Sequence, residues 1–172
     1  FSTGRYQRGE VHFSHSPAMD IQVASNFERY LYYEFETDSG RVREFMTGFL
    51  ETGKAIVNFN TLNFDTAFAS DSANDDATLS TIAQVNAEKG YLLDPHTAVG
   101  VGVGRKLRSP DVPLVCLATA HPAKFDDVIA KTLPNLTVTH DRLEALRNAE
   151  TRKSILPADP QVVKQFIHDF QL

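Results

Sequence analysis

The sequence has no tryptophan, a single cysteine and no long run of apolar residues. With Cys116 as the only thiol no internal disulfide can form, so we expect a reducing compartment and a cytoplasmic protein. No stretch approaches the roughly 20 apolar residues that a membrane-spanning helix needs. The first residues show no signal-peptide pattern either. A membrane protein is therefore not expected.

Positive charge is also scarce. The chain carries 17 Lys and Arg against 22 Asp and Glu, a net charge of −5. Nucleic acids and anionic membrane surfaces attract clustered Lys and Arg, so neither is an expected partner. An anionic small molecule is compatible with this balance, because a pocket sets its own local potential. Hydrophobic residues are plentiful, at 42% of the chain, which is typical of a globular domain with a buried core.

Two helices are predicted in the first third of the chain. Ser25 and Glu28 match a capping box, in which each side chain satisfies the other residue's free backbone N–H, so a helix is expected over 26–36. A second, amphipathic helix is indicated by apolar residues at positions i, i+3, i+4, i+7 and i+8, with Gly53 placed to end it. These apolar residues are Val42, Phe45, Met46, Phe49 and Leu50.

The next segments alternate between polar and helical patterns. Residues 54–59 indicate a short strand, and 60–76 a polar loop. A third helix is predicted up to Gly90, from apolar residues between 79 and 86. Asp94 followed by Pro95 supplies an N-cap and a proline at the first helical position, which predicts a fourth helix.

The fourth predicted helix contains Gly100, Gly102 and Gly104. A Gly-x-Gly-x-Gly run suggests a phosphate-binding loop. Dinucleotide-binding loops, however, follow a strand and open a helix, whereas these glycines come after the helix start. A phosphate loop is therefore disfavoured.

Residues 112–118 predict a buried strand, because this β-branched apolar run is bounded by prolines. Cys116 is expected to pack in the core within it. A helix over 122–131 is predicted to follow, which implies an α/β unit. Further helices are expected over 139–148 and 160–170, the last capped by Asp159.

The end of the predicted strand is the main candidate site, since ligands in open α/β sheets bind at the carboxyl ends of strands. The following helix also presents free N–H groups, which suit an anion. Thr119 offers a hydroxyl there, His121 a titratable ring and Lys124 a positive charge. From the residues alone, the alternative is a turn with a satisfied histidine and a solvated lysine.

Other candidates have weaker support. Arg29, on the first predicted helix, is positioned to reach a phosphate, although a surface ion pair with a nearby glutamate explains it equally well. His96 is more typical of a surface or cap residue than of a catalyst. His12 and His15 lack a third ligand at metal-site spacing, so no metal is expected.

Four segments of the chain resemble threonine synthase in sequence, order and spacing. The likeness is clear over residues 1–125 and looser in the tail, and it is to the longer bacterial and fungal form of the enzyme. The segments are Ser16-Pro-Ala-Met-Asp-Ile21, Ser25-Asn-Phe-Glu-Arg29, Tyr91-Leu-Leu-Asp-Pro-His-Thr-Ala98 and Ala118-Thr-Ala-His-Pro-Ala-Lys-Phe125.

This resemblance implies an α/β fold of the tryptophan-synthase-like class, in which pyridoxal phosphate lies between two domains. Residues 1–131 would be part of the larger three-layer domain, and residues 132–172 a helical C-terminal tail packed on it. The family's activity is that of a carbon–oxygen lyase: O-phosphohomoserine and water become L-threonine and phosphate. A related phospho-lyase giving 2-oxobutyrate, and a non-catalytic anion-binding module, are the alternatives.

The resemblance also assigns roles to residues. Thr119 matches the position whose hydroxyl hydrogen-bonds the pyridine nitrogen of the cofactor, and His121, Lys124 and Arg29 are candidates for the substrate phosphate. The family's Schiff-base lysine and phosphate loop lie upstream of the segment matched by Phe1. The isolated chain is therefore expected to be inactive, to need the N-terminal part of the enzyme as its partner, and to expose apolar surface where that part would pack.

Overall fold

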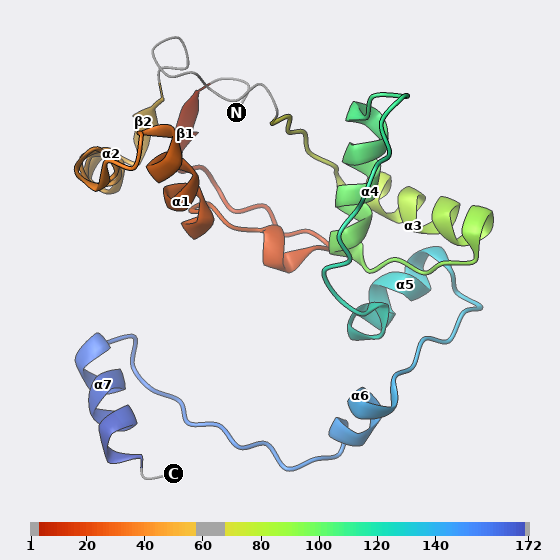
Figure 1. The fold of residues 1–172 in the computed structure, drawn as a ribbon. Coiled ribbons are helices and arrows are strands. Elements are labelled where there is room, and N and C mark those ends of the chain that lie inside the picture. Colours follow the sequence, from red (N-terminus) through yellow and green to blue (C-terminus); the bar gives the residue numbers. More distant parts are fainter. Residues whose placement is uncertain (1–3, 58–67, 171–172) are drawn as a thin grey trace. The chain divides into compact units, whose positions relative to one another are not determined.

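The computed structural model describes residues 4–57 and 68–170, and the chain is mostly helical with one small sheet (Figure 1). Contacts divide it into two units, Phe1–Val138 and Thr139–Leu172. The domain boundary predicted after residue 131 concerns a whole enzyme and stays a prediction. Among the described residues, no helix has the length and apolar character needed to cross a membrane.

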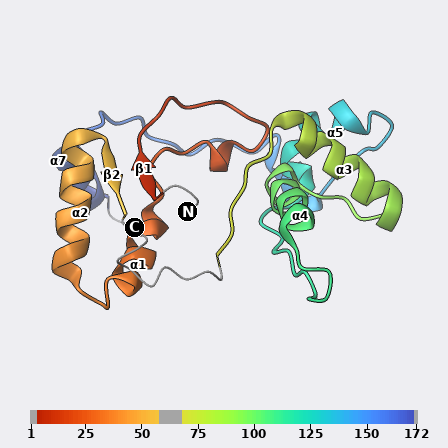
Figure 2. The ribbon, with the colours of Figure 1, turned by 90° about the horizontal axis from the view of Figure 1, so that it is seen from above.

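The N-terminal part of the first unit packs two helices beside a two-stranded sheet (Figure 2). The two strands are antiparallel, with Tyr6 opposite Ala55. The Tyr6 ring stacks on Phe49, with ring centroids 4.3 Å apart, and so joins the sheet to the helical core. The elements are β1 (Arg5–Gln7), α1 (Ser25–Glu34), α2 (Ser39–Thr52) and β2 (Lys54–Ile56). The buried core residues are Leu31, Phe35, Met46, Phe49 and Val57.

The amphipathic pattern correctly predicted α2. Gly53 caps this helix in the left-handed conformation, with φ of 71°, which L side chains rarely adopt. The predicted capping box at α1 is wrong. Ala24 is the N-cap, without a side-chain cap bond, and Ser25 already belongs to the helix. The predicted strand forms over 54–56. Residues 58–67, which include the first eight residues of the predicted polar loop, lie outside the described residues.

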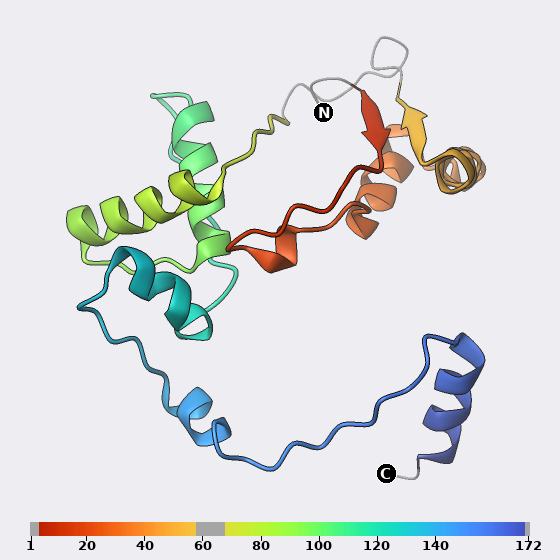
Figure 3. The same ribbon diagram turned by 180° about the vertical axis from the view of Figure 1, so that it is seen from behind.

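A second cluster in the same unit is built from three helices and a 3-10 turn (Figure 3). Gly102 has a packing role, because a Cβ there would lie 3.0 Å from the Thr81 hydroxyl on the neighbouring helix. The elements are α3 (Asp75–Lys89), α4 (Pro95–Leu107), η2 (Pro122–Phe125) and α5 (Asp126–Thr132). The buried core residues are Ile82, Val85, Leu93, Ala98 and Ile129. The Gly-x-Gly-x-Gly run thus lies within a helix.

The strand predicted over 112–118 is wrong. This segment is irregular and exposed, and Val115 and Leu117 are each 81% accessible. Cys116 is likewise exposed rather than in the core. A strand needs a neighbour to satisfy its backbone hydrogen bonds, and no described residue pairs with this segment. Its exposed side chains confirm the expectation of exposed apolar surface.

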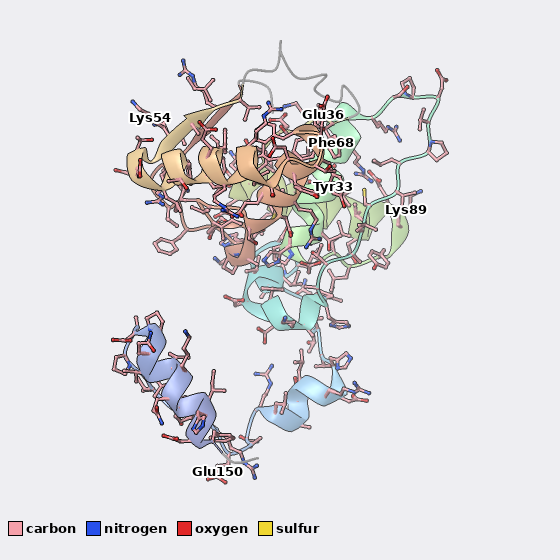
Figure 4. The ribbon with its side chains drawn as sticks, turned by 60° about the vertical axis from the view of Figure 1, so that its left-hand side comes forward. Tyr33, Glu36, Lys54, Phe68, Lys89 and Glu150 are labelled. Atoms are coloured by element: carbon pink, nitrogen blue, oxygen red, sulfur yellow. The ribbon has the colours of Figure 1, made fainter. Side chains whose placement is uncertain are left out.

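The second unit contains α6 (Asp141–Leu146) and α7 (Pro160–Asp169). Asp159 caps α7 as predicted, accepting from the backbone N–H groups of Gln161 and Val162. Both helices are present within the predicted ranges. No residue of either helix is buried, and the stretch between them, which includes Glu150 (labelled in Figure 4), has no regular structure.

Candidate functional site

A hollow of about 930 Å³ lies along one side of α4 in the first unit, and we call it the α4 hollow. Its wall is largely apolar, with Val99, Val103 and Leu107 from α4 and Leu114 and Leu117 from the irregular segment that follows. Thr119 and Lys124 also line it. Two of the predicted site residues therefore share one hollow.

Asp94 anchors the start of α4. Its side chain is 1% exposed, and its Oδ1 accepts from the backbone N–H of His96 at 3.0 Å and of Thr97 at 3.4 Å. This is the N-cap that the Asp94–Pro95 pair predicted. The carboxylate is thus fixed in the protein rather than exposed to the hollow's solvent.

Thr97 connects this buried carboxylate to Thr119. The Thr97 hydroxyl donates to Asp94 Oδ2, and Thr97 Oγ1 accepts from the Thr119 backbone N–H at 3.0 Å. The hydroxyl oxygens of Thr97 and Thr119 lie 3.2 Å apart. Both threonines line the hollow, but Thr97 is 5% exposed whereas Thr119 is exposed. The Thr119 hydroxyl is thereby held at the wall by a buried support.

His96 joins an N-terminal segment to the start of α4. It lies in the cap of this helix, as one predicted alternative had it, and the other alternative, a surface position, is wrong. Its side chain is only 9% exposed. Nε2 accepts from the Ala18 backbone N–H at 3.3 Å, and Nδ1 lies 3.1 Å from Asp94 Oδ1. Because Nε2 accepts, the ring proton is on Nδ1 and is donated to Asp94. The ring also contacts Phe125, with centroids 4.8 Å apart.

His121 and Lys124 occupy different positions around the turn η2. His121 is its N-cap, and His121 Nδ1 accepts from the Ala123 backbone N–H at 3.2 Å. Lys124 is exposed and lines the α4 hollow, whereas His121 is not among the lining residues. Of the two, the structure brings only Lys124 together with Thr119.

Arg29 is exposed on α1 and is not among the residues that line the hollow. The hollow has a second cationic residue, Arg108, which the sequence did not single out. Thr97 was also missed as a support for Thr119. The three-residue spacing of Asp94 and Thr97 signals a helix cap, but nothing in the sequence shows that Thr97 meets Thr119.

His15 is involved in an ionic cluster. Its Nε2 lies 3.8 Å from Asp75 Oδ2 and 3.4 Å from Lys131 Nζ. Its backbone N–H donates to Asp75 Oδ1 at 2.9 Å. Within residues 4–57 and 68–170, no three or more His, Cys, Asp or Glu side chains are grouped so as to hold a metal ion.

The α4 hollow is suited to a flat ring with one polar atom. The apolar wall offers contact for the ring, and the Thr119 hydroxyl is a fixed hydrogen-bonding group beside it. Lys124 and Arg108 add positive charge that suits an anionic substituent, and Asp71, the acidic residue of the lining, is paired with Lys106. The residues present therefore fit an anionic aromatic ligand.

Comparison with known proteins identifies the family that this chain resembles. The family model described as threonine synthase, C-terminal, matches residues 97–167. Threonine synthase from Corynebacterium glutamicum is 36% identical over 98% of this chain, and that from Pseudomonas aeruginosa is 37% identical over 96%. The chain spans about 37% and 36% of the lengths of these two relatives.

Solved structures agree with the sequence comparisons. PLP-bound threonine synthase from Brucella melitensis matches 96% of this chain with a TM-score of 0.83 at 34% identity, and the match covers 36% of that protein. Yeast threonine synthase matches 98% of this chain with a TM-score of 0.78 at 30% identity, over 38% of that protein.

The chain thus has the fold of one part of an α/β enzyme, and this part is mostly helical. The enzymes with this fold include one whose structure contains bound PLP. Within that class, the chain belongs to the threonine synthase family and corresponds to its C-terminal part.

Proposed function

We propose that this chain forms part of a threonine synthase that converts O-phosphohomoserine and water to L-threonine and phosphate with pyridoxal phosphate. The enzyme would be a carbon–oxygen lyase acting on phosphates. Family membership supports the reaction, and the α4 hollow supports a role for this chain in it. Pyridoxal phosphate supplies the electron sink that stabilises carbanion charge next to the amino group of the substrate.

Thr119 is the residue that we assign to the cofactor. Its hydroxyl lies on the α4 hollow, where it would hydrogen-bond the ring nitrogen and orient the ring against the apolar wall. The observation that carries this assignment is the fixed position of Thr119. Its backbone N–H and hydroxyl both meet Thr97, which is itself bonded to buried Asp94.

The substrate phosphate requires cationic or donating groups, and Lys124 is the best placed of the candidates. It lines the same hollow as Thr119. Arg108 lines that hollow too and joins the candidates. His121 lies at the neighbouring turn and Arg29 on α1, so they stay candidates without a place in the hollow's lining.

The remaining catalytic and cofactor-binding residues would come from the part of the enzyme that this chain does not include. The lysine that binds the cofactor covalently and the loop that binds its phosphate are proposed to lie in the N-terminal part, which would also cover the exposed apolar residues of segment 112–118. The 172-residue chain alone is then inactive.

A borohydride experiment tests whether the covalent lysine lies outside this chain. The 172-residue chain is incubated with pyridoxal phosphate, reduced and digested, and the modified lysines are located by mass spectrometry. We expect no stoichiometric modification at one position. Stoichiometric labelling of Lys124 would contradict the proposal, because it would supply a covalent cofactor site within this chain.

Substitution of Thr119 tests the cofactor contact in a polypeptide of the relatives' full length that contains this chain. Thr119→Val keeps the shape and the backbone N–H but removes the hydroxyl, which leaves the ring nitrogen without its partner. The loss of about 1–3 kcal/mol corresponds to a roughly ten- to 150-fold decrease in cofactor affinity, turnover or both. Thr119→Ser should retain much of the activity.

Thr78→Val is the matched control. Thr78 is 2% exposed on α3, and its hydroxyl donates to the Asn74 carbonyl, outside the α4 hollow. This variant should lose stability and keep its cofactor affinity. Wild-type affinity and turnover in Thr119→Val would remove Thr119 from the site.

The two alternatives to the synthase are a related phospho-lyase and a non-catalytic anion-binding module. Product analysis with O-phosphohomoserine separates the reactions, because the synthase yields threonine whereas the phospho-lyase yields 2-oxobutyrate. A non-catalytic anion-binding module would bind phosphate and yield neither.

A further inference from the structure

His96 contacts three separate segments that line the α4 hollow. It belongs to the start of α4, its Nε2 accepts from the Ala18 backbone N–H, and its ring packs on Phe125 of η2. Ala18 lies in the 3-10 turn η1 (Pro17–Met19), and all three residues of this turn line the hollow. One side chain thus joins the start of α4, η1 and η2 around the same hollow.

The protonation of the His96 ring follows from a donor whose role is fixed. A backbone N–H can only donate, so Nε2, 3.3 Å from the Ala18 nitrogen, is the unprotonated acceptor. A neutral imidazole then carries its proton on Nδ1, which lies 3.1 Å from Asp94 Oδ1. Since Asp94 is 1% exposed and is the N-cap of α4, the ring is held at both nitrogens.

The segment around η1 depends on few hydrogen bonds for its position. Residues 14–20 close on themselves, because the Ser14 hydroxyl and backbone N–H donate to the Asp20 carboxylate. In the described part of the chain, hydrogen bonds join this segment to the cluster of α3, α4 and α5 at two residues, His15 and Ala18. Of these two, only Ala18 belongs to η1, so the bond to His96 is the one that fixes the turn itself.

We propose that His96 is a positioning residue that, with its proton on Nδ1, holds η1 in place as one wall of the α4 hollow. All three residues of η1 are exposed, and Met19 is 50% accessible, so close packing does not fix the turn. The consequence for catalysis rests on the proposed function. A displaced wall would leave part of a bound substrate exposed to water and weaken its binding.

NMR correlations between the ring nitrogens and ring protons of histidine test the first step in the unsubstituted 172-residue chain. At a pH where the ring is neutral, His96 should give the pattern of the Nδ1-protonated form. The pattern of the Nε2-protonated form would overturn the inference, because that nitrogen could not accept from Ala18.

Hydrogen exchange of the Ala18 amide tests the positioning. His96→Phe keeps a ring against Phe125 but removes both nitrogens, and we expect this amide to exchange about two- to tenfold faster. His96→Gln supplies an amide oxygen as acceptor and should restore much of the protection. His15→Gln is the matched control, because it removes the other ring but keeps the His15 backbone N–H that donates to Asp75. It should leave the Ala18 amide unchanged, and equal exchange in all variants would overturn the inference.

Steady-state kinetics test the consequence in a polypeptide of the relatives' full length that contains this chain. His96→Phe should raise KM for O-phosphohomoserine about two- to tenfold and leave kcat within about twofold, because the loss falls on binding rather than on the reacting groups. His96→Gln should restore KM. A large fall in kcat with KM unchanged would show that His96 acts on the chemistry, and the positioning role would be wrong.

The outcomes separate this inference from the proposed function. If the full-length protein forms no threonine from O-phosphohomoserine, the proposed function fails, while the ring pattern and the Ala18 exchange still decide whether His96 holds η1. If the protein forms threonine but the Ala18 amide does not respond to His96→Phe, the proposed function stands and the role of His96 is wrong.

Discussion

The start of α4 and the segment 112–118 differ in whether their backbone polar groups and apolar side chains have partners. Those at the start of α4 do, and those of segment 112–118 largely do not. At α4, Asp94 satisfies two backbone N–H groups only two and three residues away. In segment 112–118 the predicted strand has no paired neighbour in the described part of the chain, and Leu117 stays 81% exposed. The cap of α4 needs only local partners, whereas the predicted strand needs a distant one that the described residues do not supply.

This difference shows which predicted elements can form in the isolated chain. A helix cap needs one side chain and a turn of backbone, whereas a buried strand needs neighbouring strands and covering helices. The following predictions test this contrast in the 172-residue chain, from the largest expected effect to the smallest.

Asp94→Ala should give the largest loss of stability. It removes the cap of α4 and leaves the buried Thr97 hydroxyl without its acceptor. A lost cap costs about 0.5–2 kcal/mol and an unsatisfied buried donor about 1–3 kcal/mol, so we expect a loss of about 2–4 kcal/mol in the free energy of unfolding. Urea denaturation followed by circular dichroism measures it.

Asp159→Ala is the matched control for that experiment, since Asp159 also caps a helix with its carboxylate. Its surroundings are exposed, so water replaces the lost acceptor and the cost should be at the low end for a cap, about 0.5–1 kcal/mol. Equal losses for the two variants would show that burial of the Asp94 network adds nothing.

Gly90→Ala should cost about 1–2 kcal/mol, because Gly90 ends α3 in the left-handed conformation, with φ of 63°. A Cβ there meets nothing within 4 Å, so the cost is purely conformational. Gly48→Ala, inside α2 and equally free of contacts, should instead stabilise the chain by up to about 1 kcal/mol. Thermal unfolding compares them, and a loss of stability in Gly48→Ala would contradict the explanation.

Val115→Lys should change the stability of this chain by less than about 0.5 kcal/mol, because Val115 is 81% exposed. In a polypeptide of full family length, where we propose that the segment is covered, the same change should be strongly destabilising. Unfolding curves of the two proteins make the comparison. A large effect in the 172-residue chain would show that the segment is already packed.

A carboxylate with a local partner gives the smallest effect. Hydrogen bonds from the Ser14 side chain and backbone lower the pKa of Asp20 below its ordinary value of 3.8. A depressed folded-state pKa adds stability that is present above pH 3.8 and is lost as the pH falls through the folded-state value.

Ser14→Ala removes the first of these hydrogen bonds, so the pKa of Asp20 should rise. Carboxyl NMR during a pH titration measures the change, and Ser72→Ala, which keeps the Ser14 contacts, serves as the control. An unchanged Asp20 pKa in Ser14→Ala would show that the hydroxyl is not the cause.

The sequence by itself determined the helices whose signals are local. The apolar stripe of α2, the glycine ends at Gly53 and Gly90, and the Asp94–Pro95 start of α4 were all readable, since each depends on residues within a few turns. The capping box predicted at Ser25 is wrong. Such a motif makes a cap possible at that residue but does not require it, and the helix begins one residue earlier than predicted.

The family and the assignment of Thr119 to the cofactor were both predicted from sequence motifs. The comparisons confirmed the family, and the role of Thr119 stays a prediction. Only the tertiary structure decided what surrounds Thr119. It kept Lys124 but not His121 of the predicted site in the α4 hollow, added Arg108, and put Thr97 and buried Asp94 behind the Thr119 hydroxyl. The physical reason is chain distance: Thr97 and Thr119 are 22 residues apart, and no local periodicity or spacing specifies a contact made by folding.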